Sequence, residues 1–317
     1  MDTVKYLEKI LEKNRNLDIA TRLSRNPNYS VMRLFLQKFR VIAGFIVFSA
    51  ISFPMLRKTK KITKMVKNTA SGRNALVIAG GPSAASLNIE KIICDQASEK
   101  LDVFAMNWFT HTRLAEFIKP DFYVLSDPIN RINRGGVFKN RSSSAIWEKL
   151  IEWKTTKVII PHYWYPDSKF ISNEIAMFID DRELIGFSKS VDPTKPRGYN
   201  SLTALKTLAA ALYLGYAEVY VIGLDGTAFK TLYVNDQNLV YEGSNNLADS
   251  AETPMTLRSS GWPGGMSDML YNHSLEFLDI KRCFVNQKIT NLNCDSMHDG
   301  FKKHVDHIYI EKIIGNM

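Results

Sequence analysis

The 317-residue chain is 45% hydrophobic and 23% charged, which is typical of a folded protein with a large core and excludes a mostly disordered chain. Its three cysteines, Cys94, Cys283 and Cys294, form no CxxC pair, so we expect a reducing compartment with neither a zinc site nor a structural disulfide. The first thirty residues are polar and charged, so no secretory signal is expected in them.

The net charge of +9 is concentrated near the N-terminus. Residues 1–73 contain 16 Lys and Arg against 4 Asp and Glu, a formal charge of +12, whereas the rest of the chain contains 25 against 28, a charge of −3. Because nucleic-acid enzymes more often spread basic residues over their working surface, we expect no nucleic-acid partner.

Residues 41–56 form an uncharged apolar stretch that is too short to span a bilayer, which takes about 20 residues, and Pro54 interrupts its end. Seven bases and no acid follow in residues 57–73. The pattern predicts a helix at a membrane surface, held to anionic lipid through residues 33–67. The alternative is that the helix packs on the main domain or on a second subunit, which leaves a homo-oligomer open. Residues 60–74 are predicted to form a linker.

From residue 74 onward, short apolar runs alternate with helical patterns. Strands are predicted at 75–80, 102–107, 121–128, 157–162 and 218–226, and helices at 87–98, up to 117, and at 201–215 with Gly215 as the stop signal. This alternation predicts an α/β, Rossmann-like domain over residues 74–317, with a mostly parallel sheet covered by helices on both faces. Residues 1–73 are then a basic, membrane-associating helical segment.

Small or polar residues stand at the ends of these strands. They are Gly80, Gly81, Pro82 and Ser83, then Asn107, then Ser126 and Asp127, then His162, and finally Asp225. Ligands of parallel sheets bind at the carboxyl ends of the strands, and a glycine turn that opens a helix suits a phosphate, so these residues are predicted to line a nucleotide site. The alternatives are a tight turn at the glycines and a helix cap at Asp127.

Four segments resemble known proteins, in the same order and at similar spacing: IAGGPSAASL, DVFAMN, KPDFYVLSDP and SLTALKTLAAALYLGYAEVYVIGLDG. Across about residues 74–295 the chain resembles the bacterial lipooligosaccharide sialyltransferases that use CMP-N-acetylneuraminic acid. It also resembles the MptE-like and motility-associated-factor group, which is linked to flagellin glycosylation and, in archaea, to pterin pyrophosphokinase activity. The GGPS turn is not GxGxxG, so a nicotinamide dinucleotide is not implied.

The resemblance implies roles for individual residues. Gly81, Ser83 and Asn107 would lie against the nucleotide and its phosphates, although Gly80 stands where those enzymes usually have Asn. Asp225 would bind the cytidine ribose or base. The start of the long helix would hold donor oxygens through Asn200, Ser201 and Thr203, a role that also suits the free donors of a helix N-terminus.

Residues 227–267 are rich in Gly, Asn, Ser and Pro and are predicted to form a lid that excludes water. By the resemblance, Tyr233 in this lid would neutralise the leaving phosphate in place of a metal, while the second lid tyrosine is replaced by Thr227. The general base would be His273, whose alternative role is that of a core histidine. His162 is the competing candidate and His298 a further one.

The resemblance, taken with these features, implies an inverting glycosyltransferase with a His base. It would transfer an acidic 2-keto sugar, sialic acid or Kdo-like, from a CMP-sugar to a cell-surface glycan at the cytoplasmic side of the bacterial inner membrane. No resident cofactor or metal is expected. Two alternatives stay open: an MptE-like pyrophosphokinase, which would need Mg²⁺ with Asp127 and Asp225 as candidate ligands, and a non-catalytic membrane-docked nucleotide-binding protein.

Overall fold

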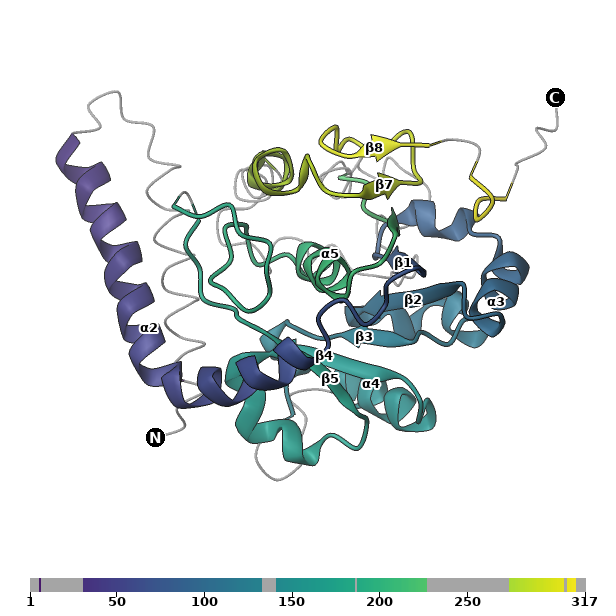
Figure 1. Cartoon of the computed structure of the whole chain (residues 1–317), viewed down its shortest axis with the longest axis horizontal. Coiled ribbons are helices and arrows are strands. Elements are labelled where there is room, and N and C mark those ends of the chain that lie inside the picture. Colours follow the sequence, from purple (N-terminus) through teal and green to yellow (C-terminus); the bar gives the residue numbers. More distant parts are fainter. Residues whose placement is uncertain are drawn as a thin grey trace, which may run out of the picture.

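The computed structural model describes residues 31–132, 141–185, 187–226, 274–304 and 307–311, together with Tyr6. They form an α/β domain around one eight-stranded parallel sheet, in the order β5-β4-β3-β2-β1-β6-β7-β8 (Figure 1). The strands are β1 (Asn74–Ile78), β2 (Leu101–Met106), β3 (Phe122–Val124), β4 (Lys157–Pro161), β5 (Ile175–Ile179), β6 (Glu218–Ile222), β7 (Ile289–Asn291) and β8 (Lys302–Lys303).

The α-helices are α2 (Val31–Met65), α3 (Ile89–Ala97), α4 (Arg141–Glu152) and α5 (Thr203–Leu214). Short 3₁₀ helices follow the strands: η1 (Pro82–Ser86), η2 (Asn107–His111), η3 (Arg113–Glu116), η4 (Pro128–Asn130) and η5 (His162–Phe170). A π-helical turn, η7 (Ile280–Phe284), precedes β7. The predicted Rossmann-like fold is therefore confirmed.

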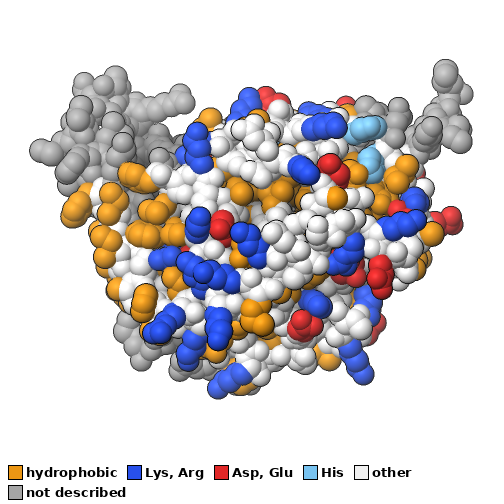
Figure 2. Space-filling model, in the orientation of Figure 1, with side chains coloured by type: hydrophobic (Ala, Val, Ile, Leu, Met, Phe, Trp, Pro, Cys, Tyr) orange, Lys and Arg blue, Asp and Glu red, His pale blue; other side chains and the backbone are white. Residues whose placement is uncertain are grey.

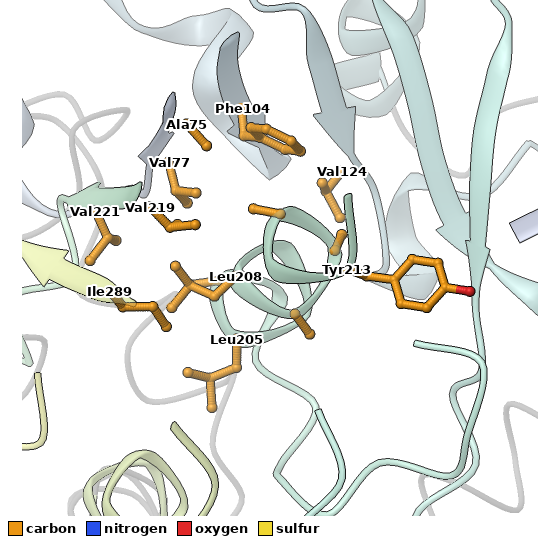
Figure 3. Close-up of a cluster of buried hydrophobic side chains, with 14 of the residues drawn as sticks. Ala75, Val77, Phe104, Val124, Leu205, Leu208, Tyr213, Val219, Val221 and Ile289 are labelled. Atoms are coloured by element: carbon orange, nitrogen blue, oxygen red, sulfur yellow. The ribbon is translucent and has the colours of Figure 1, made fainter. Parts of the chain in front are cut away.

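Each face of the sheet carries its own hydrophobic core. Alternate strand residues such as Leu76 and Val103 point to the face covered by α3, α4 and part of α2. The residues between them, such as Val77 and Phe104, point to α5 on the opposite face (Figure 3). Because both faces are covered, the central strands are apolar at nearly every position and do not alternate between apolar and polar residues.

Helix α2 differs from its prediction. It bends part-way along (Figure 1) but continues past Pro54 to Met65, so the predicted linker is helical in its first part and begins later than expected. The proline ring removes one backbone hydrogen bond and forces a bend without ending the helix. The part after the bend packs along β5, the edge strand, where the Thr63 hydroxyl donates to the Phe178 carbonyl oxygen at 2.8 Å and accepts from the Phe178 N–H at 3.0 Å.

Two other expectations need correction. The helical stretch predicted to end at residue 117 is two short 3₁₀ helices, η2 and η3. The third strand is three residues long, Phe122–Val124, and the polar residues predicted as its end lie in the following loop. Helix α5 runs from Thr203 to Leu214 and is capped by Gly215, which adopts the left-handed conformation (φ 86°) that favours glycine.

Candidate functional site

The candidate site lies where the strand order reverses. The chain runs outward from β1 through β2 to β5, and then returns to the other side of β1 with β6. The loops after β1 and β6 therefore leave neighbouring strands at the same edge of the sheet, which is where open α/β sheets bind their ligands.

The loops after β1 and β6 are joined directly through their backbones. The Gly81 N–H donates to the Gly223 carbonyl oxygen at 2.8 Å, and the Gly223 N–H donates to Ser83 Oγ at 3.0 Å. A Cβ at Gly81 would lie 2.5 Å from the Gly223 oxygen, so no larger residue fits without moving backbone. Close packing of two loops, rather than the approach of a phosphate, accounts for glycine at this position.

Asp225 fastens the same two loops with its side chain. The buried carboxylate accepts from the Ser83 N–H at 3.0 Å, from Ser83 Oγ at 2.5 Å and from Asn293 Nδ2 at 2.8 Å. It therefore occupies the anion position at the start of η1, where the sequence pattern placed a ligand phosphate. Ser83 and Asp225 are brought together as predicted, but here they bind each other.

A cavity of about 160 Å³ opens beside this junction. It is lined by the ends of β1, β2 and β6 and by the start of α5: Ile78, Ala79, Gly80, Met106, Asn107, Trp108, Phe109, Thr112, Leu202, Ala204, Gly223 and Leu224. The exposed Gly80 and the start of α5 thus share one cavity. Its volume is below the ~300–1,000 Å³ of pockets that enclose a drug-sized ligand, so it would enclose only part of a ligand of that size.

Asn107 is the polar residue in this cavity with an unsatisfied group. Its backbone has a positive φ of 48°, and its carbonyl oxygen accepts a 2.6 Å hydrogen bond from the Tyr123 hydroxyl. Its side-chain oxygen Oδ1 is buried and has no hydrogen-bond partner among the described residues. A buried unpaired carbonyl oxygen is costly, and a donor group on a ligand in the cavity would satisfy it.

The N-terminus of α5 forms another wall of the cavity. No side chain of the described part of the chain caps its first turn, whose N–H groups have no helical acceptor. Asn200 Oδ1 accepts from the Leu202 N–H at 3.1 Å, and Thr203 Oγ1 lies 2.8 Å from Ser126 Oγ. An uncapped helix start beside a cavity favours an anionic ligand. Ser201 is exposed next to this turn.

Helix α5 is held in place by buried charges. Lys206 Nζ lies 2.7 Å from Asp181 Oδ1, and Arg197 Nε donates to the same oxygen at 2.9 Å. Arg197 also pairs with Glu183. Burial alone would raise the pKa of Asp181, but Lys206 and Arg197 outweigh it and hold that pKa below its ordinary value. Burial lowers the pKa of Lys206, an effect that the nearness of Asp181 opposes.

His162, predicted as a competing base, does not line the cavity. Its ring is 1% exposed and packs edge-on against Phe48 of α2. Its Nδ1 atom lies 3.2 Å from the Asp181 backbone nitrogen and 3.3 Å from the Ile179 carbonyl oxygen, so the ring is held by backbone groups at the end of β5. Burial lowers the pKa of His162 despite the nearby Asp180 and Asp181 carboxylates. The structure assigns this histidine to the packing of α2 on the domain.

Of the other predicted residues, some have structural roles and some lie outside the described residues. The exposed Asp127 caps η4 by accepting from the Ile129 N–H at 3.0 Å, which is the helix-cap role given above as its alternative, and Pro82 begins η1. Tyr233, His273 and the predicted lid at 227–267 lie outside the described residues. His298, the further candidate, is 1% exposed and packs on the Phe277 ring.

Trp108 is a cavity residue that the sequence analysis missed. It is half-buried and follows Asn107 in η2, where its ring meets His111 edge-on with centroids 5.2 Å apart. An aromatic residue directly after the polar end of a buried strand was the available signal. Among the described residues, no group of three or more His, Cys, Asp or Glu could hold a metal ion.

The fold of the chain has a distant likeness to a solved glycosyltransferase structure. The chain matches no known protein family and no curated protein. It is similar to the MAf glycosyltransferase from Magnetospirillum magneticum AMB-1. The two share 14% identity and a TM-score of 0.42, over 83% of this chain and 41% of that one. The chain thus spans about two fifths of that protein, and the α/β fold rests on its own strand order.

Proposed function

We propose that this protein is a glycosyltransferase that takes an acidic 2-keto sugar, sialic acid or Kdo-like, from a CMP-sugar and transfers it to a cell-surface glycan. One observation carries the proposal: a cavity at the reversal of strand order joins the uncapped N-terminus of α5 to the unpaired Asn107 oxygen. These groups suit a phosphate and a hydrogen-bond donor, and the ordered motifs of the sequence resemble CMP-sugar enzymes.

The donor would bind with its phosphate toward the first turn of α5 and with a hydroxyl or amino group toward Asn107 Oδ1. Trp108 offers an aromatic wall for the base or the sugar. Asp225 does not contact the donor in this proposal. Its hydrogen bonds to Ser83 and Asn293 hold the loops after β1 and β6, which shape the cavity. Asp225 is a positioning residue in this proposal.

Transfer would proceed with inversion. The acceptor hydroxyl oxygen forms a bond to the anomeric carbon, the bond from that carbon to the phosphate oxygen breaks, and CMP leaves with the electron pair. A histidine takes the hydroxyl proton, since its ordinary pKa suits a base near neutral pH. His273 is the proposed base, with Tyr233 assisting the leaving phosphate without a metal. The enzyme would work peripherally at the cytoplasmic side of the bacterial inner membrane.

The test is a thermal-shift screen of the purified chain with CMP, CDP, UDP, GDP and ATP, with and without Mg²⁺. A ligand that binds only the folded state raises the melting temperature by mass action, so CMP should give the largest shift, independent of Mg²⁺. Release of CMP from CMP-sialic acid or CMP-Kdo should follow and should fail in His273→Ala.

Other outcomes assign other functions. A shift with ATP that requires Mg²⁺ would favour a pyrophosphokinase. CMP binding without turnover of either CMP-sugar, unchanged in His273→Ala, would favour a nucleotide-binding protein without catalysis. The absence of any CMP shift would contradict the proposal.

A further inference from the structure

One face of α2 stays exposed on both sides of the Pro54 bend. Its side chains follow each other at helical spacing and are apolar before the bend and basic after it: Phe39, Ile42, Ile46 and Phe53, then Arg57, Lys61 and Lys64. Phe39, Ile46 and Phe53 are 60%, 58% and 60% exposed. We call these seven residues the α2 stripe. Figure 2 shows hydrophobic side chains gathered over α2 at the left of the view, with Lys and Arg below and beside them.

The opposite face of α2 is fixed to the domain. Phe48 is 2% exposed and meets the rings of His162 and Tyr163 edge-on. Also before the bend, Arg182 lies over the Phe45 ring while it pairs with Asp180. After the bend, Thr63 is hydrogen-bonded to β5. The helix therefore cannot turn the α2 stripe inward without breaking these contacts.

These contacts also bear on whether the helix crosses a membrane. Residues Ile42–Met65 are long and apolar enough to be a candidate span among the described residues. However, the segment after Pro54 is held against the edge of the sheet through Thr63, and a spanning helix would need lipid or other helices around it. The apolar part of the stripe, from Phe39 to Phe53, is about 21 Å long at 1.5 Å per residue, shorter than the ~30 Å hydrocarbon core.

We propose that the α2 stripe docks the protein along the surface of an anionic lipid bilayer without crossing it. The apolar side chains before Pro54 enter the boundary between headgroups and acyl chains, and the bases after it meet the lipid phosphates. Charge complementarity favours an anionic bilayer as the partner of the α2 stripe. Helix α2 contains no Asp or Glu, so a second copy laid against the stripe would bring no acid from α2 to its bases, whereas an anionic bilayer supplies negative charge along the whole surface. The proposal does not depend on which nucleotide the site binds.

The experiment is co-flotation of the full chain with two kinds of vesicle, phosphatidylcholine alone and phosphatidylcholine mixed with phosphatidylglycerol, at low and high salt. We expect binding that requires phosphatidylglycerol and weakens with salt. Three bases near an anionic surface contribute a factor on the order of 100 in affinity, so Arg57→Gln/Lys61→Gln/Lys64→Gln should lose about that much. Phe39→Ser/Ile46→Ser/Phe53→Ser should lose about tenfold or more through lost apolar burial.

Matched controls are available at exposed positions elsewhere in the domain. Phe117→Ser/Ile151→Ser/Phe187→Ser removes the same side chains, and Arg113→Gln/Lys119→Gln/Lys195→Gln removes the same charges. Both control variants should float like the wild type. Since every substituted residue is exposed, thermal unfolding should stay within about 2 °C of wild type for all four.

Three results would overturn the proposal. One is wild-type binding that is equal on both kinds of vesicle or insensitive to salt. Another is flotation of the stripe variants that matches their controls. The third is a dimer of the wild type in lipid-free sedimentation equilibrium that the apolar stripe variant dissociates, which would assign the stripe to a second copy. The wild-type salt series decides the matter even if a variant fails to fold, and the nucleotide screen on the same samples reports separately on the proposed function.

Discussion

Asn107 and Asp225 follow the two strands that flank β1, but their side chains differ in hydrogen bonding. The Asp225 carboxylate accepts three hydrogen bonds from Ser83 and Asn293, whereas the buried Asn107 Oδ1 has none among the described residues. A satisfied buried group mainly stabilises the fold, and an unsatisfied one is available to a ligand. The two residues should therefore respond differently to substitution.

The role of the Asn107 side chain can be tested by a substitution that keeps the backbone conformation of this residue. Asn107→Gly keeps a residue that tolerates a φ of 48° and should weaken CMP binding about tenfold with little loss of stability. Asn107→Ala should also lose about 1–2 kcal/mol of unfolding free energy through backbone strain. Calorimetric titration with CMP and urea unfolding measure the two effects. Wild-type CMP affinity in both variants would show that the amide makes no contact with the nucleotide.

For Asp225, we predict a loss of stability. In Asp225→Asn, an amide N–H₂ would face donors that now point at a carboxylate oxygen, so at least one charge-assisted hydrogen bond is lost. We expect a decrease of about 1.5–3 kcal/mol in the free energy of unfolding by urea denaturation. Asp127→Asn is the matched control, because Asn caps a helix about as well as Asp and should change stability by less than about 0.5 kcal/mol. Equal effects of the two substitutions would contradict the assigned role of Asp225.

At the scale of elements, a buried ion pair ties α5 to the segment that follows β5. Lys206 lies in the first turn of α5, where it is fully buried, and pairs with Asp181, which follows β5 and also pairs with Arg197. Breaking one member of a buried group leaves an uncompensated charge, whereas removing both partners can be nearly neutral. The position of the α5 N-terminus at the cavity therefore rests partly on this ion pair.

Lys206→Met should lower the free energy of unfolding by about 3–5 kcal/mol, because Asp181 and Glu183 are then balanced by Arg197 alone. The double variant Lys206→Met/Asp181→Asn should recover a large part of this loss. Urea unfolding of the wild type, both single variants and the double variant gives the coupling free energy. Additive effects would show that the two charges do not interact.

At the scale of the whole molecule, α2 and the sheet meet through the neutral His162 ring. An unfolded histidine takes up a proton below its ordinary pKa of about 6.5, whereas burial holds the folded pKa lower. The unfolded state then binds more protons. The contribution of His162 to the free energy of unfolding should therefore be fully present above about pH 6.5 and should be lost as the pH drops toward the folded pKa. The rings of His111 and His307 also have lowered pKa values, so the effect is measured by difference.

The melting temperature of the wild type should therefore fall more steeply than that of His162→Gln between about pH 7.5 and 5.5, where a histidine of ordinary pKa changes charge. Gln keeps a polar side chain of similar length that does not titrate in this range. Parallel curves for the two proteins would mean that His162 does not contribute to the pH dependence of stability.

The sequence predicts the sheet better than it predicts the site. Buried parallel strands are continuous apolar runs, so β1, β2, β4 and β6 could be found from local pattern alone. The roles of Ser83 and Asp225 depend on contacts across 142 positions of sequence, which no local pattern contains. The course of α2 past Pro54 was mispredicted for a similar reason, because packing against β5 offsets the hydrogen bond that proline removes.

The two hydrogen bonds between Thr63 and Phe178 have a practical consequence. They satisfy backbone groups on the open side of β5, and an uncovered edge strand is a template for joining sheets from different molecules. Deleting residues 1–65 to remove the apolar stretch at 41–56 should therefore make the protein less soluble, not more. The truncated chain would expose the backbone N–H and C=O groups of β5 and would aggregate through this strand, which α2 covers in the full-length protein.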